Sequence, residues 1–374
     1  MNYEELYKDC VWVDFDKLTN FMIEVFKKVG VPEEDAKICA DVLITSDKRG
    51  IDSHGIGRFK PIYIDRINDG IINPKTTFEI VKESPTTAVI DGQNGMGQVI
   101  GYRSMKIAID KAKKYGMGMV AVRNSNHYGI AGYYALMASD NGMIGITGTN
   151  ARPSIAPTFG VENMLGTNPL TIAFPTDEEF PFCIDCATSI TQRGKIEVYA
   201  RLGKEMPKGW VIDENGESKT DPNVVLEDLI KGRAALTPLG GIGEDGGGYK
   251  GYSYAVVVEV LSAALAQGAY LKSLLGYDEN GKKIPYKLGH FFIAINIENF
   301  VDLESFKKTS GDIMRKLRNS KKMPGAERIW TAGEKEHDAY LYRKDKGVPI
   351  DPVLQKQIKE LIAKYDLKQF DFPF

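Results

Sequence analysis

Short apolar segments alternate with helical patterns through the middle of this chain, and this order restricts its fold more than any other feature. Thr87–Asp91 and Met117–Arg123 are predicted strands, because each is a short apolar run of strand length. A helical pattern that ends near Tyr115 separates them, and a helix of small residues at about 131–140 precedes a strand at Met143–Thr147. Further strands are predicted at Leu170–Phe174, Pro181–Ile184 and His290–Asn296. Such alternation favours an α/β domain built around a buried sheet.

Helical patterns lie on both sides of this alternating region. Residues 16–30 place apolar side chains at helical spacing and end at Gly30, and Pro32 with the acidic residues after it opens a second helix. A third helix is predicted around Arg58–Asn68, and the tail Pro352–Tyr365 forms another. These patterns predict a helical N-terminal lobe that is joined by the C-terminal helix.

The length of the chain indicates more than one lobe, since 374 residues exceed what a single hydrophobic core usually supports. We expect residues 1–76 to form the helical lobe, packed with residues 345–374. Residues 77–344 are then expected to form an α/β region that carries the binding sites and includes a glycine-rich loop at 240–248.

Charge and hydropathy argue against two classes of partner. The formal net charge is −2, from 48 basic and 50 acidic residues, and no basic stripe is visible, whereas nucleic-acid binding depends on clustered lysine and arginine. No apolar run approaches the roughly 18–20 residues that a membrane-spanning helix needs. Met1–Glu5 is polar and acidic rather than a secretory leader. We therefore expect a cytoplasmic protein without nucleic-acid or membrane partners.

The chain has four cysteines, and two of them have a spacing that suits metal or redox chemistry. Cys183 and Cys186 form a Cys-Ile-Asp-Cys sequence, a spacing also found in zinc knuckles and thioredoxin-like redox pairs. A closed zinc site takes four ligands, usually from two such pairs, and Cys10 and Cys39 lie too far apart in the sequence to form the second. We therefore expect no metal and interpret the pair as small buried residues of a strand.

Two glycine-rich segments have features of phosphate-binding loops. Gly241–Gly246 matches G-x-G-x-x-G, but the short, proline-broken segment before it is not a convincing central strand, and more glycine follows. We therefore reject a Rossmann dinucleotide site here and interpret the glycines as a mobile loop over a site or as a helix start packed close to backbone. Gly92–Gln98 also precedes a helix, where backbone amides could hold an anion. A tight strand-to-helix turn is the interpretation that we prefer for it.

The whole chain has four histidines, and two of them lie in short polar clusters. His54 stands within Asp52–Gly55, four residues before Arg58, and His127 stands within Asn124–Gly129. Histidine can exchange a proton near neutral pH, and the planar guanidinium of arginine suits a carboxylate. A turn residue whose ring binds a backbone carbonyl is the alternative for His54. Together the two clusters predict an enzyme that acts on a small anionic substrate.

Two further segments carry polar side chains that suit the same chemistry. Lys195 could polarise a carbonyl oxygen, although a solvated helix charge explains it equally well. Asp185–Ser189 ends a predicted strand with small and hydroxylated residues, as a contact to phosphate or ribose needs. An ordinary helix N-cap made by Thr188 or Ser189 is the alternative.

Five motifs follow one another in a recognisable order: Arg49–Gly55, Asn126–Gly129, Gly166–Pro169, Asp185–Ser189 and Lys208–Trp210. With them the chain resembles, from about residue 12 to about residue 350, the malate/L-lactate dehydrogenase family that lacks a Rossmann domain. That family includes sulfolactate dehydrogenases, ureidoglycolate dehydrogenases and piperideine-carboxylate reductases. The resemblance implies NAD(P)-dependent interconversion of 2-hydroxy and 2-oxo acids, or imine reduction in some members. It also implies an α/β fold with a non-Rossmann, mixed-sheet cofactor domain, and a homodimer with the active site near the subunit interface.

The resemblance further implies roles for individual residues. His127 matches a proton acceptor, Ser53 with His54 matches a proton relay, and Arg58 matches the arginine that binds the substrate carboxylate. Thr167 is a further candidate contact for the substrate, and Lys195 is a further catalytic candidate. The implied cofactor contacts are His127, Tyr128, Gly129, Ile130, Ala131, Asp185, Cys186, Ala187, Gly333, Glu334, Lys335 and Glu336.

Two residues depart from the family pattern. Cys186 stands where methionine is common, and Lys195 stands where imine-reducing members tend to have an acidic residue. The second departure favours a hydroxy acid over a cyclic imine as substrate. A cyclic-imine carboxylate reductase and a non-catalytic binding protein of the same fold are the alternatives. The sequence leaves open the choice between NAD and NADP, and between His54 and His127 as the acid/base group.

Overall fold

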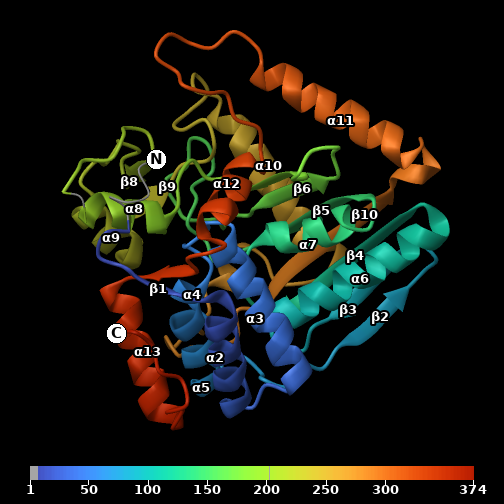
Figure 1. Ribbon diagram of the computed structural model, residues 1–374. Helices are drawn as coiled ribbons and strands as arrows, with labels where there is room; N and C mark the ends of the chain where they lie inside the picture. The colour runs from blue at the N-terminus through green and yellow to red at the C-terminus, as the bar shows by residue number, and fades with distance from the viewer. Residues whose placement is uncertain (1–6, 202) are drawn as a thin grey trace.

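The computed structural model describes residues 7–201 and 203–374, and a seven-stranded sheet forms its centre (Figure 1). The strands follow the order β2 (Glu79–Glu83), β3 (Thr87–Asp91), β4 (Met117–Ser125), β10 (Leu288–Asn296), β5 (Met143–Thr149), β6 (Leu170–Phe174) and β7 (Phe182–Cys186). β3 and β4 run parallel, and the other neighbouring pairs are antiparallel. The sheet is therefore mixed, as expected, and the late strand β10 lies between β4 and β5.

β2 is the strand of this sheet that the sequence did not predict, because its residues lack an apolar pattern. All five of its residues are exposed, and Glu79, Lys82 and Glu83 give it charges. Charged side chains on an edge strand oppose pairing with another chain. The inner strand β4, by contrast, buries Val120 and Val122, which explains why its apolar run predicted a strand.

Two helices pack on this sheet and complete its core. Met105 of α6 (Gly97–Tyr115) and Tyr134 of α7 (Ala131–Ser139) share one hydrophobic cluster with Val120 of β4 and Phe292 of β10. Burial of such side chains stabilises a domain by about 1.5–3 kcal/mol each. Within Gly92–Gln98, residues 92–96 connect β3 to α6 and the last two residues begin α6, so this segment is the strand-to-helix turn that we preferred.

Helices from both ends of the chain form a second core. α2 (Phe15–Lys28) and α3 (Glu33–Lys48) share it with α13 (Pro352–Tyr365), and β1 (Val11–Val13) pairs antiparallel with β11 (Val348–Ile350) (Figure 1). The aromatic ring of Phe21 meets those of Phe59, Phe370 and Phe372 edge to face. The two ends of the chain therefore contribute to one hydrophobic cluster, while the division of the chain at residue 76 stays a prediction.

The third predicted helix is divided by a wider turn. It consists of α4 (Ile56–Arg58), the π-helix η1 (Phe59–Ile64) and α5 (Asp65–Asn68). A π-helical turn adds residues relative to an α-helix, and such turns are frequent at functional sites. Tyr63 lies in this turn and is fully buried.

A smaller unit surrounds the glycine-rich loop. It contains α8 (Arg193–Arg201), β8 (Val211–Asp213), α9 (Pro222–Lys231), β9 (Ala234–Leu236) and α10 (Gly248–Ala263). β9 pairs with β8 in a two-stranded sheet and not with the seven-stranded sheet. The G-x-G-x-x-G match that follows β9 therefore does not open a Rossmann unit, in agreement with the sequence.

The last third of the described chain contains further helical elements. They are the 3₁₀ turns η2 (Ala264–Ala266), η3 (Leu271–Leu274) and η4 (Ile297–Asn299) and the α-helices α11 (Leu303–Arg318) and α12 (Glu334–Arg343). α10 ends at Ala263, where η2 follows it, and the sequence did not predict α9 or α12. None of the described helices is long and apolar enough to cross a membrane. Met1–Glu5, on which the expectation of a missing leader rests, lies outside the described residues.

Candidate active site

The loop after α3 carries Ser53 and His54, and hydrogen bonds from the last turn of α3 fix its conformation. The hydroxyl of Ser46 donates a hydrogen bond to the backbone oxygen of Ile51 at 2.8 Å. The buried carboxylate of Asp47 accepts the N–H of Ile56 at 2.9 Å. A Cβ at Gly55 would lie 1.8 Å from Oδ1 of Asp47, so a side chain directly after His54 would displace this carboxylate.

The fold brings the two predicted histidines together. The rings of His54, from the loop after α3, and His127, from the segment after β4, stack with centroids 5.7 Å apart and an angle of 19°. The hydroxyl of Ser53 lies 2.8 Å from Nδ1 of His54. Ser53, His54 and His127 are therefore neighbours, as a proton relay needs.

Tyr63 joins this group, and the sequence did not single it out. Its hydroxyl lies 2.6 Å from Nδ1 of His127, and the N–H of Gly129 donates to the same nitrogen at 3.3 Å. An N–H only donates, so Nδ1 must be an acceptor, and the hydroxyl of Tyr63 donates to it as well. Neutral His127 therefore carries its proton on Nε2. A tyrosine within an apolar helical run indicates a core residue, and no sequence signal marks its contact with His127.

Burial and nearby cations keep both histidines neutral. Burial, followed by the charge of Arg58, lowers the pKa of His54 to about 4. Burial also lowers the pKa of His127 well below its usual range, with further contributions from His54, Arg66 and Arg58. Two guanidinium groups thus act on His127, and such a field favours an anionic substrate.

Arg58 lies at the edge of the histidine pair. Its Nε donates a hydrogen bond to the backbone oxygen of Ser53 at 2.6 Å. A Cβ built on Gly194 would lie 3.9 Å from Nη2 of Arg58, so the first turn of α8 borders the same site. The ammonium of Lys195, one residue on, lies 4.9 Å from the ring centroid of Trp210. Lys195 is thus engaged in a cation–π contact, and its catalytic role stays a prediction.

Thr167 lies next to the end of β7. Its backbone oxygen accepts the N–H of Thr188 at 2.9 Å and the hydroxyl of Thr188 at 3.2 Å. These bonds join the motif Gly166–Pro169 to the motif Asp185–Ser189. The side chain of Thr167 is partly exposed, and its contact with substrate stays a prediction.

The segments predicted to bind the cofactor also converge. Oδ2 of Asp185 accepts the N–H of Gly132 at 2.7 Å, which joins the end of β7 to the start of α7 just after Ala131. The N–H of Cys183 donates to the backbone oxygen of Ala332 at 3.4 Å, which places the start of α12 beside β7. His127–Ala131, Asp185–Ala187 and Gly333–Glu336 therefore come from three elements that meet near β7.

The groups at this meeting point fit a nicotinamide dinucleotide. Nε of Arg49 is buried and has no hydrogen-bond partner within the described part of the chain. Burial raises the pKa of Asp185, while the hydrogen bonds from Gly132 and Thr171 and the charge of Arg49 oppose this rise. A guanidinium and the amides that open α7 suit a pyrophosphate, and the carboxylates of Asp185 and Glu336 suit ribose hydroxyls.

Two residues of the predicted cofactor set have other partners. The buried carboxylate of Glu334 accepts the N–H of Thr331 at 3.0 Å and forms an ion pair with Arg328. The ammonium of Lys335 lies 5.4 Å from the ring centroid of Trp330. These contacts hold the start of α12 in place, and a direct contact of Glu334 or Lys335 with the cofactor stays a prediction.

The cysteine pair does not form a metal centre in the described residues. Cys183 is a buried thiol of β7, and burial raises its pKa to about 12. Cys186 is partly exposed, and both sulfurs are free thiols. Among the residues that the structure describes, no group of three or more histidine, cysteine or acidic side chains could hold a metal ion.

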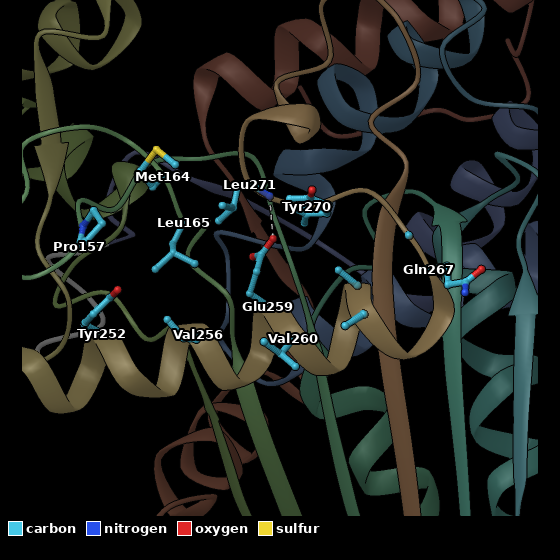
Figure 2. Close-up of a pocket in the computed structure, with 13 residues that line it drawn as sticks. Pro157, Met164, Leu165, Tyr252, Val256, Glu259, Val260, Gln267, Tyr270 and Leu271 are labelled. Carbon is cyan, nitrogen blue, oxygen red and sulfur yellow. Dashed lines mark hydrogen bonds between the residues drawn. The ribbon is translucent and has the colours of Figure 1, made fainter.

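An apolar groove of about 700 Å³ runs along α10, and none of its lining residues is a predicted site residue (Figure 2). Figure 2 shows Tyr252 and Val256 projecting from α10 toward Met164 and Leu165. Apolar side chains form most of its wall. The groove is thus lined by other residues than the polar group around His127.

Comparisons with known proteins agree with the geometry. The sequence model of the malate/L-lactate dehydrogenase family matches residues 13–359. The malate dehydrogenase of Pyrococcus abyssi is 46% identical over 98% of this chain and 99% of that protein. The L-sulfolactate dehydrogenase of Methanocaldococcus jannaschii is 44% identical over 94% of this chain and 96% of that protein. The crystal structure of malate dehydrogenase from Entamoeba histolytica matches with a TM-score of 0.93 at 49% identity, covering 98% of this chain and 100% of that one.

Proposed function

We propose an activity for this chain that starts from its family. The chain belongs to the malate/L-lactate dehydrogenase family and is a 2-hydroxy acid dehydrogenase. We infer that it interconverts a small 2-hydroxy acid and its 2-oxo acid with NAD or NADP. The observation that supports this best is the arrangement of two hydrogen-bonded pairs, Tyr63–His127 and Ser53–His54, whose histidine rings stack beside Arg58. That group provides a proton donor next to a carboxylate-binding guanidinium.

The proposed roles follow from the tautomer of His127. Arg58 binds the substrate carboxylate, and Nε2 of His127 donates a hydrogen bond to the oxygen on the adjacent carbon. A nicotinamide held by the segments that meet at β7 would supply or accept the hydride at that carbon. As the oxygen gains charge, His127 gives it the Nε2 proton, and Nδ1 takes the proton of Tyr63. Burial raises the pKa of Tyr63 above its usual value, and the charges of Arg66 and Arg58 oppose this rise only in part.

The cofactor is proposed to lie where the three segments meet at β7. Asp185 and Glu336 would contact ribose hydroxyls, and Arg49 with the amides at the start of α7 would contact the phosphates. His54 and Ser53 would orient the substrate or relay the proton. Lys195 and Thr167 stay candidates for contact with the substrate oxygen and carboxylate.

The two guanidinium groups near His127 favour a substrate with two acidic groups. Arg58 suffices for the carboxylate that every 2-hydroxy acid carries, and the guanidinium of Arg66, which lies 4.4 Å from the ring centroid of Tyr286, adds a second positive charge near His127. The names of the relatives, malate and sulfolactate dehydrogenase, describe substrates of this kind. We therefore propose a preference for dianionic 2-oxo acids over pyruvate.

The test is oxidation of NADH and NADPH, followed by absorbance, with oxaloacetate, sulfopyruvate, pyruvate and a cyclic-imine carboxylate. We expect turnover with the first two and a higher KM for pyruvate. Turnover with the imine alone would replace the proposal by imine reduction. Absence of turnover with every compound, in a folded protein that binds neither cofactor, would favour a non-catalytic protein.

A homodimer is part of the proposal, and α10 supports it. Tyr254, Val257 and Val260 are 55%, 47% and 51% exposed on a helix whose other faces are also apolar. A helix that is apolar all round is normally buried, so a second copy is proposed to cover this face and the groove beside it. Sedimentation equilibrium should give a dimer for the unsubstituted chain and a monomer for Val257→Glu. A monomeric unsubstituted chain at micromolar concentration would refute this part. A cytoplasmic location stays a prediction.

A further inference from the structure

Arg343, the last residue of α12, is the largest fully buried side chain among the described residues and lies outside the predicted site. Its Nη1 donates hydrogen bonds to the backbone oxygen of Asp47 at 2.6 Å and to Oδ1 of Asp52 at 2.7 Å. Its Nη2 donates to Oδ2 of Asp52 at 2.9 Å and to the hydroxyl of Tyr7 at 2.6 Å. The guanidinium therefore holds Asp52 with both arms, a geometry that lysine cannot reproduce.

The groups that Arg343 binds lie at the base of the loop that carries His54. Asp52 directly precedes Ser53, and Asp47 lies in the last turn of α3. The carboxylate of Asp47 also accepts the N–H of Ile56 on the far side of the loop. The chain is thus fixed before His54 by the bonds of Arg343 and after His54 by the bond between Ile56 and Asp47.

α12 connects this loop with the predicted cofactor segment. The helix begins directly after Gly333, within the stretch Gly333–Glu336, and ends at Arg343. It packs against the start of the loop, because a Cβ at Gly50, whose φ is +72°, would lie 2.7 Å from Cβ of Ala339. One short helix therefore extends from the cofactor segment to Asp52.

We propose that Arg343 is a positioning residue: through Asp52 it holds Ser53 and His54 against His127, and through α12 it ties that loop to the cofactor segment. The hydrogen bonds of Arg343 reach Asp47, Asp52 and Tyr7 rather than either histidine, so its effect passes through the loop. The consequence for turnover rests on the proposed function. The position of the loop is a property of the folded chain and can be measured without turnover.

Because the chain has few histidines, the position of the loop can be followed through the NMR signal of His54. The chain has four, so labelling with ¹³C at Cε1 gives four signals, and His54→Ala identifies that of His54. Burial and then Arg58 lower the pKa of His54 to about 4. When Arg343→Met releases the loop into solvent, we expect this pKa to rise toward about 6.5. Arg315→Met is the matched control, because Arg315 holds Asp177 with the same two-armed geometry, at 2.8 and 3.2 Å, on α11.

The effect on turnover is measured in two backgrounds. In the otherwise unsubstituted chain, we expect Arg343→Met to lower kcat by up to about 100-fold, because a displacement of about 1 Å in a catalytic group can cost that much. Arg343→Lys should restore only part of the lost kcat, because lysine lacks the two-armed geometry. In a His54→Ala background, Arg343→Met should add little, because both substitutions remove the same contribution. A residue that only stabilises the fold would lower activity equally in both backgrounds.

Two results would overturn the proposal: an unchanged pKa of His54 in Arg343→Met, or an equal fall in kcat with and without His54. If Arg343→Met does not fold, Asp52→Asn tests the same contact, since asparagine keeps the size but offers one acceptor oxygen. Absence of turnover in the unsubstituted chain would refute the proposed function instead. The histidine signals would then still decide whether Arg343 positions the loop.

Discussion

Tyr63→Phe removes a single oxygen from the site and tests how the proton of His127 is held. Tyr63 is fully buried and its ring meets that of Phe26 edge to face, so phenylalanine fits the same space. The variant loses the 2.6 Å hydrogen bond to Nδ1 of His127 and keeps the longer bond from Gly129 at 3.3 Å. With only the longer bond left, the tautomer that is protonated on Nε2 is less strongly favoured, and a larger share of His127 carries its proton on Nδ1 and has none on Nε2.

The size of the effect separates two roles of the hydroxyl. One buried hydrogen bond contributes about 0.5–1.5 kcal/mol, and about 1.4 kcal/mol corresponds to a tenfold change in a ratio. We therefore expect kcat for reduction to fall about tenfold if Tyr63 only sets the tautomer. If Tyr63 also passes its proton to Nδ1, the loss should reach the 10²- to 10⁴-fold range that we expect for His127→Ala.

The assay is NADH oxidation at saturating cofactor, with KM for the 2-oxo acid measured alongside kcat. Tyr365→Phe is the matched control, because the hydroxyl of Tyr365 bonds to Asn68 at the surface of the helical lobe. We expect the control to leave kcat unchanged and Tyr63→Phe to leave KM nearly unchanged. A kcat for Tyr63→Phe equal to that of the control would show that the hydroxyl does not act on the proton of His127.

Three further predictions concern single groups. Arg58→Lys should raise KM for the 2-oxo acid with little change in the NADH dissociation constant, because the charge stays but the fork is lost; an unchanged KM would exclude Arg58 as the carboxylate ligand. Arg49→Met should weaken NADH binding, followed by protein fluorescence, by about tenfold, the equivalent of one charge-assisted hydrogen bond of about 1.4 kcal/mol. The free energy of unfolding should fall as pH falls from about 6.5 to about 4, because His54 and His127 take up protons in the unfolded chain before they do so in the folded one. Thermal unfolding across this range measures it, and His54→Ala should reduce the slope.

The fold was predictable where apolar periodicity reflects burial. β3 and β6 have the bounds that their apolar runs predicted, and α13 begins and ends where predicted. β2 was missed because an exposed, charged edge strand lacks that pattern. α12 was missed because its burial depends on polar groups such as Glu334 and Arg343, whose partners come from other parts of the fold.

The candidate site was predictable in its members but not in their geometry. Ser53, His54 and His127 stand in polar clusters that indicate chemistry, yet their stacking results from contacts between a loop and a strand end that no spacing reveals. Tyr63 was missed because the π-helical turn that directs it toward His127 cannot be read from an apolar run. The spacing around Lys195 fits a catalytic residue and a solvated helix charge equally well, and it does not reveal the contact with Trp210.

The central position of β10 affects how the chain is made. Leu288–Asn296 leaves the ribosome long after β4 and β5, and until it arrives both strands present an open edge toward each other. We expect nascent chains stalled before Leu288 to aggregate or to depend on chaperones, since half-built sheets expose pairing groups. Ser53, His54, His127 and Lys195 have all been synthesised by then. Premature termination before β10 should therefore give a chain that contains every proposed catalytic side chain but lacks the strand that joins the two parts of the sheet.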